Sequence, residues 1–102
     1  MSFTFSPEGI KLTQQLNNPN WCFLFEMLCA FCYHRGYSVT KDEGLCLYSD
    51  MSDDYRRTKI IKNASRLLDK EYLFKWFIKF LKSYDNITIS DLDIFAIKKR
   101  IN

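Results

Sequence analysis

The sequence predicts an all-α protein, folded as a compact bundle of four to five helices in a single helical domain over residues 1–102. Three glycines and two prolines are too few for a loop-rich or all-β fold. Residues 21–33 are apolar or aromatic on every helical face, with Glu26 as the one charge. A helix that is apolar all round must be buried. This segment is therefore expected to form the central helix, packed against a second apolar helix at 73–84.

Two helix starts are marked in the N-terminal third. Ser6 is a natural N-cap, because its side chain accepts a hydrogen bond from a free backbone N–H, and a helix is expected over 7–16. Asn18 and Pro19 repeat the arrangement, since proline fits the first helical position. Gly36 supplies the left-handed residue at which a helix stops. The sequence therefore predicts two helices joined by a tight corner.

The segment 37–48 allows two interpretations. Its alternating halves, separated by a loop at 41–44, favour one short β-hairpin. Thr40 followed three positions later by Glu43 is instead a capping-box pattern, which predicts a short helix ending at Leu47. The helical surroundings favour the short helix, and the hairpin stays open as the alternative.

The C-terminal half shows helical periodicity after Ser52, the expected N-cap of the next helix. One helix over the whole apolar stretch that follows would be about 48 Å long at 1.5 Å per residue. That is too long for a small domain, so we expect a break near Asp69 and a separate helix at 71–84. Ser90, with Asp93 three positions later, is the start of a last helix.

Charge is distributed unevenly along the chain. Residues 1–54 carry three basic and seven acidic groups, a net charge of −4, whereas residues 55–102 carry twelve basic and five acidic groups, a net charge of +7. Such asymmetry is typical of proteins whose partner is directed by electrostatics. The alternative is that the lysines simply solvate the outer faces of the C-terminal helices.

Four cysteines and one histidine are the strongest candidates for metal ligands. Zinc motifs place paired cysteines on a turn that folds around the metal, whereas Cys29 and Cys32 fall inside an expected helix. A redox dithiol normally opens a helix that follows a strand, and no strand is expected here. We therefore expect no metal, no cofactor, and reduced, packed thiols at Cys22, Cys29, Cys32 and Cys46. His34 is expected to act as a cation at its helix end.

The N-terminus lacks the basic and apolar segments of a secretory signal, and an apolar run of about 13 residues is too short to span a bilayer. We therefore expect a cytoplasmic protein that does not engage a membrane. Glycine-rich phosphate loops, nucleophile elbows and paired-carboxylate patterns are absent from the sequence, so an enzyme is not expected. Glu26 is either a buried acid, whose pKa burial would raise, or a side chain that reaches solvent or a lysine of the C-terminal half.

The leading functional hypothesis is a small protein-binding module that acts as an inhibitor or regulator by docking on another macromolecule. Toxin-immunity proteins and phage-encoded antagonists are of this type, which is an analogy of class alone. Large aromatic side chains that stay exposed would anchor the partner. The candidates for these anchors are Trp21, Phe23, Tyr72 and Trp76.

Two alternative functions remain open at this stage. A helical nucleic-acid-binding regulator would neutralise phosphates with a basic helix face. The candidates for that face are Arg56, Lys59, Arg66, Lys70, Lys75 and Lys79. The second alternative is a self-associating structural subunit, because the apolar content is high enough to leave surface for a homo-oligomer.

Overall fold

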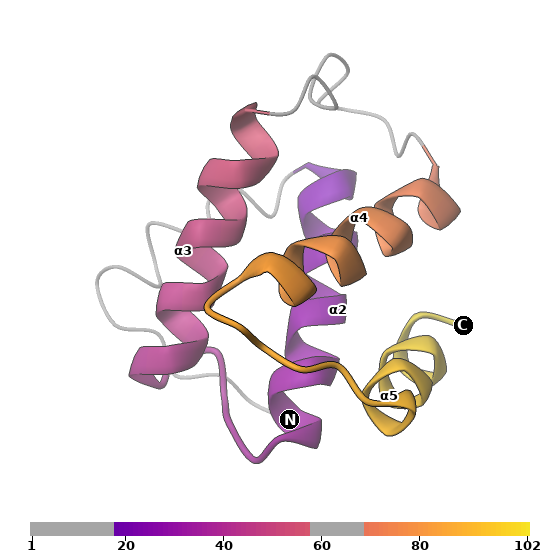
Figure 1. Ribbon diagram of the computed structural model, residues 1–102. Coiled ribbons are helices and arrows are strands. Elements are labelled where there is room, and N and C mark those ends of the chain that lie inside the picture. Colours follow the sequence, from indigo (N-terminus) through magenta and orange to yellow (C-terminus); the bar gives the residue numbers. More distant parts are fainter. Residues whose placement is uncertain (1–17, 58–68) are drawn as a thin grey trace.

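The computed structural model describes residues 18–57 and 69–102, and the elements found there are all helices (Figure 1). The expected helix at 7–16 lies outside the described residues, as does the part of the expected helix beyond residue 57. The all-α prediction is confirmed for the described part, which holds α2 (Pro19–His34), α3 (Asp42–Arg57), α4 (Lys70–Ser83) and α5 (Asp91–Ile101).

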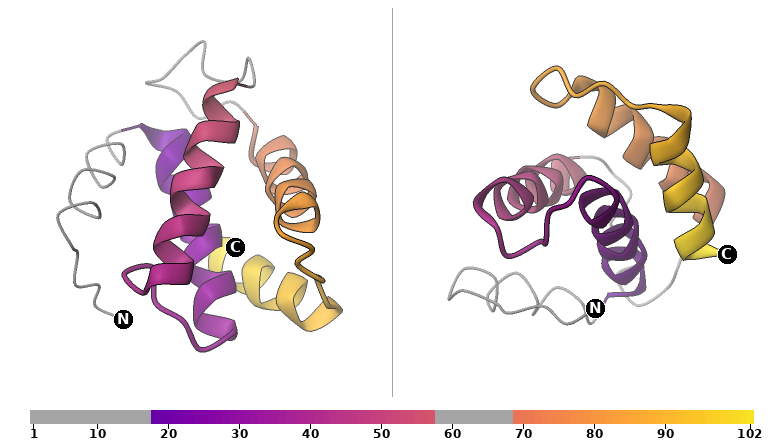
Figure 2. Two further views of the ribbon diagram at one scale, coloured as in Figure 1. Left: turned by 60° about the vertical axis from the view of Figure 1, so that its left-hand side comes forward. Right: turned by 90° about the horizontal axis from the view of Figure 1, so that it is seen from below.

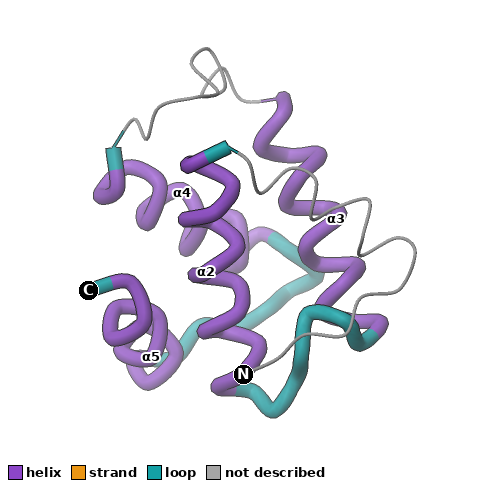
Figure 3. The backbone as a smooth tube through the Cα atoms, turned by 180° about the vertical axis from the view of Figure 1, so that it is seen from behind, coloured by secondary structure: helices purple, strands orange, loops and turns teal. Residues whose placement is uncertain are grey.

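Helix α2 lies at the centre of the described bundle, and the other three helices all pack against it. Helix α3 runs along one side of α2 and α5 lies on the other side (Figure 2), whereas α4 crosses α2 (Figure 1). The view from behind shows the same order, with α2 between α3 and α5 (Figure 3). None of the helices in the described segments is both long and apolar enough to cross a membrane.

Most of the apolar run 21–33 is buried in the central helix, as predicted, whereas Cys22, Glu26 and Tyr33 are exposed. Leu24, Met27 and Leu28 of α2 are fully buried against Phe77 of α4 and Ile97 of α5. Burying a side chain of this size stabilises a fold by about 1.5–3 kcal/mol. The core continues toward α3 through edge-to-face aromatic contacts, whose rings belong to Trp21, Phe25, Tyr48, Tyr55 and Trp76.

The capping signals of α2 act as the sequence predicts. The side chain of Asn18 accepts a hydrogen bond from the backbone N–H of Asn20 at 2.9 Å, and Pro19 occupies the first turn. Gly36 has a φ of +81°, the left-handed conformation that ends a helix. The expected break near Asp69 is also confirmed, because its side chain caps α4 by accepting from the N–H of Tyr72 at 3.1 Å.

Helix α3 corrects the expectations for residues 37–57. The β-hairpin over 37–48 is not formed, and the helix neither ends at Leu47 nor restarts at Ser52, which is buried within it. The buried side chains explain why one helix forms, since they recur at helical spacing along a single face. They are Leu47, Tyr48, Met51 and Tyr55.

Gly44 sits where the first turn of α3 meets the preceding loop. A Cβ at this position would lie 2.6 Å from the carbonyl oxygen of Ser38 and 3.1 Å from the Cα of Val39. Alanine in a helix is ordinarily favoured over glycine by about 1 kcal/mol. Here the clash is with backbone, so Gly44→Ala is expected to lower the free energy of unfolding by about 1–3 kcal/mol.

Urea denaturation followed by circular dichroism measures this change. Ser49→Ala, at an exposed position of the same helix, is the matched control and should change the stability by less than about 0.5 kcal/mol. If Gly44→Ala is as stable as the control, the backbone at Ser38 and Val39 can move to accommodate the Cβ without loss of stability.

Candidate functional site

A buried carboxylate holds the start of α5 against the end of α2. Asp93 accepts hydrogen bonds from Arg35, at 3.2 Å from Nε to Oδ1 and 2.8 Å from Nη2 to Oδ2. The same guanidinium donates to the carbonyl of Thr88, and His34 Nε2 lies 3.4 Å from Asp93 Oδ1. Asp93 also completes the predicted capping box, because it accepts from the N–H of Ser90 at 2.9 Å. The Asp93 side chain thus connects the C-terminal end of α2, the loop before α5 and the first turn of α5.

A second ion pair holds the far end of α5. Arg100 Nε donates to Glu26 Oε2 at 2.7 Å, and both side chains are partly exposed. Glu26 therefore reaches the surface and meets a cation from the C-terminal half, which is an arginine rather than a lysine. The alternative of a buried acid is wrong.

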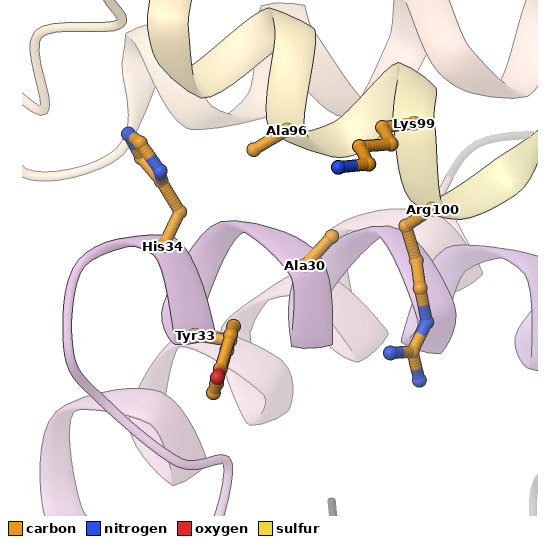
Figure 4. Close-up of a pocket in the computed structure, with 6 residues that line it drawn as sticks. All are labelled: Ala30, Tyr33, His34, Ala96, Lys99 and Arg100. Carbon is orange, nitrogen blue, oxygen red and sulfur yellow. The ribbon is translucent and has the colours of Figure 1, made fainter.

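An open groove of about 670 Å³ runs between α2 and α5. Ala30 and Ala96 face one another across it, so the helices approach without large side chains between them (Figure 4). His34 stands toward one end, with Lys99 and Arg100 toward the other. The groove therefore combines a small apolar floor with a cationic rim.

Exposed apolar side chains border this groove. Leu92 is 68% exposed and Phe95 is 65% exposed, although both are large apolar residues. Leu92 lies one helical turn before Ala96, so helix geometry places it beside the groove, with Phe95 on the same outer side of α5. Tyr33, which lines the groove from α2, is 68% exposed. We call Tyr33, Leu92, Phe95, Ala96 and Lys99 the α5 face.

A second groove, of about 400 Å³, separates α4 from α5. Its apolar side chains are Phe74, Ile78 and Ile94, and its remaining lining consists of Lys75, Lys79, Lys82 and Lys98. Lys98 Nζ lies 5.6 Å from the centre of the Phe74 ring. Lys75 pairs with Glu71 at 3.1 Å. We call these seven lining residues the lysine groove.

The charge asymmetry of the sequence becomes a separation in space. Helix α3 carries five carboxylates, whereas α4 and α5 carry six lysines and an arginine. In the described residues, α3, with these carboxylates, and α5, with Lys98, Lys99 and Arg100, lie on opposite sides of α2 (Figure 2). The carboxylates of α3 are Asp42, Glu43, Asp50, Asp53 and Asp54.

The structure separates the four predicted aromatic anchors. Trp21 is only 5% exposed and its ring packs 4.6 Å from that of Tyr55, so its expected exposure is wrong. Phe23 and Trp76 are half-buried and pack against the core. Tyr72 is 53% exposed, at the first turn of α4. The exposure of Trp21 was predicted wrongly because a residue in the first turn of a helix is buried when it lies on the face of the helix that packs against the core.

The predicted basic stripe is only partly described. Lys70, Lys75 and Lys79 are exposed on α4, and the last two line the lysine groove. The side chain of Arg56, together with Lys59 and Arg66, lies outside the described residues. The exposure of Leu92 and Phe95 was not anticipated from the sequence, because it depends on how α5 packs against the other helices.

The four cysteines differ in burial, with two buried and two exposed. Cys29 and Cys32 are buried as expected, whereas Cys22 and Cys46 are exposed, which corrects the expectation that all four are packed. None of the four is part of a disulfide. Burial raises the pKa of Cys29 to about 12, with Glu26 as the next cause, and burial likewise raises the pKa of Cys32 to about 12. Among the described residues, no three His, Cys, Asp or Glu side chains are placed to hold a metal ion.

Two thiols per native chain are expected to react rapidly with a disulfide reagent at pH 8, and two slowly. With a pKa of about 12, roughly one in 10⁴ of the Cys29 and Cys32 side chains is thiolate at that pH. Absorbance of the released thiolate measures the rates, and unfolding in guanidinium should expose all four. The double change of Cys22 and Cys46 to serine should abolish the fast phase, and a fast phase that persists would contradict the assignment.

The stability of the chain is expected to fall at acid pH through Asp93. The hydrogen bond from Arg35 is the largest cause that lowers its pKa from 3.8 to about 2, with Ser90 assisting. Since the folded pKa lies below the unfolded value, this contribution is fully present above about pH 4 and is lost as the pH falls to 2. It amounts to about 2 kcal/mol.

Urea unfolding at several pH values between 6 and 2 measures this loss. Asp93→Asn serves as the reference, because it keeps the shape of the side chain and removes its titration. The difference in stability between the two proteins should shrink as the pH falls. Parallel curves would show that another group causes the acid sensitivity.

Comparisons with protein-family models, with curated protein sequences and with solved structures give no match. The geometry of the described residues therefore carries the functional argument alone.

Proposed function

We propose that this chain is a small docking module that acts as an inhibitor or regulator by binding a partner protein through the α5 face. The observation that supports this most is the exposure of Tyr33, Leu92 and Phe95, each about two-thirds exposed. Tyr33 lines the groove, and Leu92 and Phe95 belong to α5, the helix that forms its other wall. Large apolar side chains left in water on a helix of a small domain are typical of interaction sites. Aromatic anchors of this kind supply most of the affinity in protein interfaces.

The surroundings of the α5 face suit a partner with acidic side chains. Lys99 and Arg100 border the groove, and His34 stands at its other end. Arg100 is already paired with Glu26, so Lys99 is the cation more available to a partner. Opposite charges at the rim steer encounter and fix orientation, while the apolar centre supplies affinity.

Two ion pairs hold α5, which carries most of the α5 face, against α2. Helix α5 is held at its start by the Asp93–Arg35 pair and at its end by the Glu26–Arg100 pair. A surface that is ordered in advance loses less conformational entropy on binding. The module would then act by covering a functional surface of its partner. The free cysteines fit a reducing compartment such as the cytoplasm.

Site-specific photocrosslinking tests the proposal. A benzophenone amino acid at position 95 is expected to give a discrete crosslinked partner in a native lysate, and one at position 72 is expected to give none. Phe95→Ser combined with Leu92→Ser should abolish capture of that same partner, whereas Tyr72→Ser, which removes an exposed aromatic from α4, should keep it. Loss of the partner in Tyr72→Ser alone would overturn the α5 face in favour of α4.

A second copy of the chain is the competing occupant of the α5 face. Sedimentation of the pure protein distinguishes the two cases, because a docking module for another protein should be monomeric at micromolar concentration. A wild-type dimer that Phe95→Ser dissociates would overturn the proposal and establish self-association.

A further inference from the structure

We propose that the lysine groove between α4 and α5 binds single-stranded nucleic acid. This surface lies on the opposite flank of α5 from the α2–α5 groove, and the inference goes beyond the docking function proposed above. Four lysines line one groove, and a carboxylate pairs with just one of them, Lys75, among the residues that the structure describes.

The lysines follow the groove rather than scatter over the surface. Lys75, Lys79 and Lys82 succeed one another at intervals of four and three residues along α4, which corresponds to about 10 Å of helix. Lys98 faces them from α5. Like charges held this close repel one another, and a chain of phosphates relieves that repulsion while releasing its own counterions.

The floor of the groove favours a single strand over a duplex. Phe74, Ile78 and Ile94 form an apolar floor between two helices. Lys98 Nζ lies over one face of the Phe74 ring, 5.6 Å from its centre. A base that stacks on this face must take the place of the lysine side chain, whose charge can then meet a phosphate. Grooves that bind single strands combine cations for the backbone with an aromatic ring on which a base stacks. A duplex presents paired bases that cannot reach a recessed ring.

The recess also argues against an anionic membrane as the occupant. Ile78 is buried and Phe74 and Ile94 are half-buried, so their side chains do not protrude from the surface. Membrane-binding helices instead project their apolar side chains into the lipid. Phosphates of a flexible strand can enter the groove, whereas the flat surface of a bilayer would touch only the lysines.

Fluorescence anisotropy with labelled 15-nucleotide single-stranded DNA and RNA tests the proposal on the full chain. With three or four phosphates neutralised, the slope of log K against log salt should lie between about −2 and −3. The affinity should therefore fall about 20- to 50-fold between 50 and 200 mM salt. A duplex of the same length and a polyglutamate of the same charge should bind at least tenfold more weakly.

Charge reversal locates the site. Lys82→Glu combined with Lys98→Glu should lower the affinity at least tenfold and flatten the salt slope. The matched control, Lys41→Glu combined with Arg57→Glu, makes the same change of net charge at exposed positions outside the groove and should bind as the wild type does. Equal losses in both double variants would overturn the site and indicate a response to net charge alone.

Phe74→Leu tests the stacking step, because leucine keeps the apolar floor but lacks an aromatic face. It should weaken single-strand binding by about five- to tenfold without altering the salt slope. Phe95→Ser, which would disable the α5 face, should leave nucleic-acid binding intact, so failure of one proposal is distinguishable from failure of the other. Equal binding of polyglutamate, or of vesicles with anionic lipid, would overturn the proposal.

Discussion

Asp93→Ala is expected to lower the free energy of unfolding by about 3 kcal/mol, a large effect for one surface helix. The change removes the buried partner of Arg35 and leaves the guanidinium facing the protein without its carboxylate. It also removes the acceptor for the backbone N–H of Ser90, one half of the capping box of α5. Chemical denaturation of both proteins at pH 7 measures the difference.

Asp91→Ala is the matched control for Asp93→Ala. Asp91 is an exposed carboxylate in the same first turn of α5, so it shares the favourable position near the helix N-terminus but not the ion pair. Its removal should cost less than about 1 kcal/mol. If the two variants lose equal stability, the ion pair between Asp93 and Arg35 contributes nothing beyond the helix-end charge. Hydrogen exchange should also show faster exchange of α5 amides in Asp93→Ala.

Phe77→Ala is expected to lower the free energy of unfolding by about 3–5 kcal/mol. Phe77 is fully buried where α4 crosses α2, so its loss removes apolar contact and leaves a cavity between helices. A domain of this size is stabilised by only about 5–15 kcal/mol in total. The variant should therefore melt well below the wild type, as measured by circular dichroism against temperature and urea.

Phe95→Ala removes the same side chain from a position that is 65% exposed, and it should change stability by less than about 0.5 kcal/mol. The contrast separates the two roles of phenylalanine in this chain. A large loss in Phe95→Ala would mean that the side chain supports the fold. It would then be a poor candidate for an anchor of the α5 face.

The helix ends were predictable because they depend on neighbours in sequence. Asn18 with Pro19, and Ser90 with Asp93, satisfy backbone groups within three residues of themselves, and the structure has both caps. Burial of the central helix was predictable for a similar reason, since 21–33 leaves no polar face. Helix ends and the burial of an apolar segment depend on residues close together in sequence, so they can be predicted without knowing how the rest of the chain packs.

The features that were missed depend on residues far apart in sequence. The short alternation inside 37–48 resembles a strand when it is considered alone. The buried face that continues to Tyr55 instead favours one helix from Asp42 to Arg57. Glu26 meets Arg100 across 74 positions, and its partner could be anticipated only as a cation of the C-terminal half. The two grooves exist because α5 lies beside both α2 and α4, and no short pattern encodes that placement.

Helix α5 forms a wall of both grooves, through Ala96 on one side and Ile94 on the other. With 11 residues, it is too short to be stable by itself, so it keeps its order by remaining docked. Local unfolding of α5 would therefore disrupt the α5 face and the lysine groove at the same time. If both proposals hold, a ligand in either groove would suppress that opening and leave less ordering for the other ligand to bring about. Two sites that share no residue would thus bind with positive cooperativity, equal in both directions.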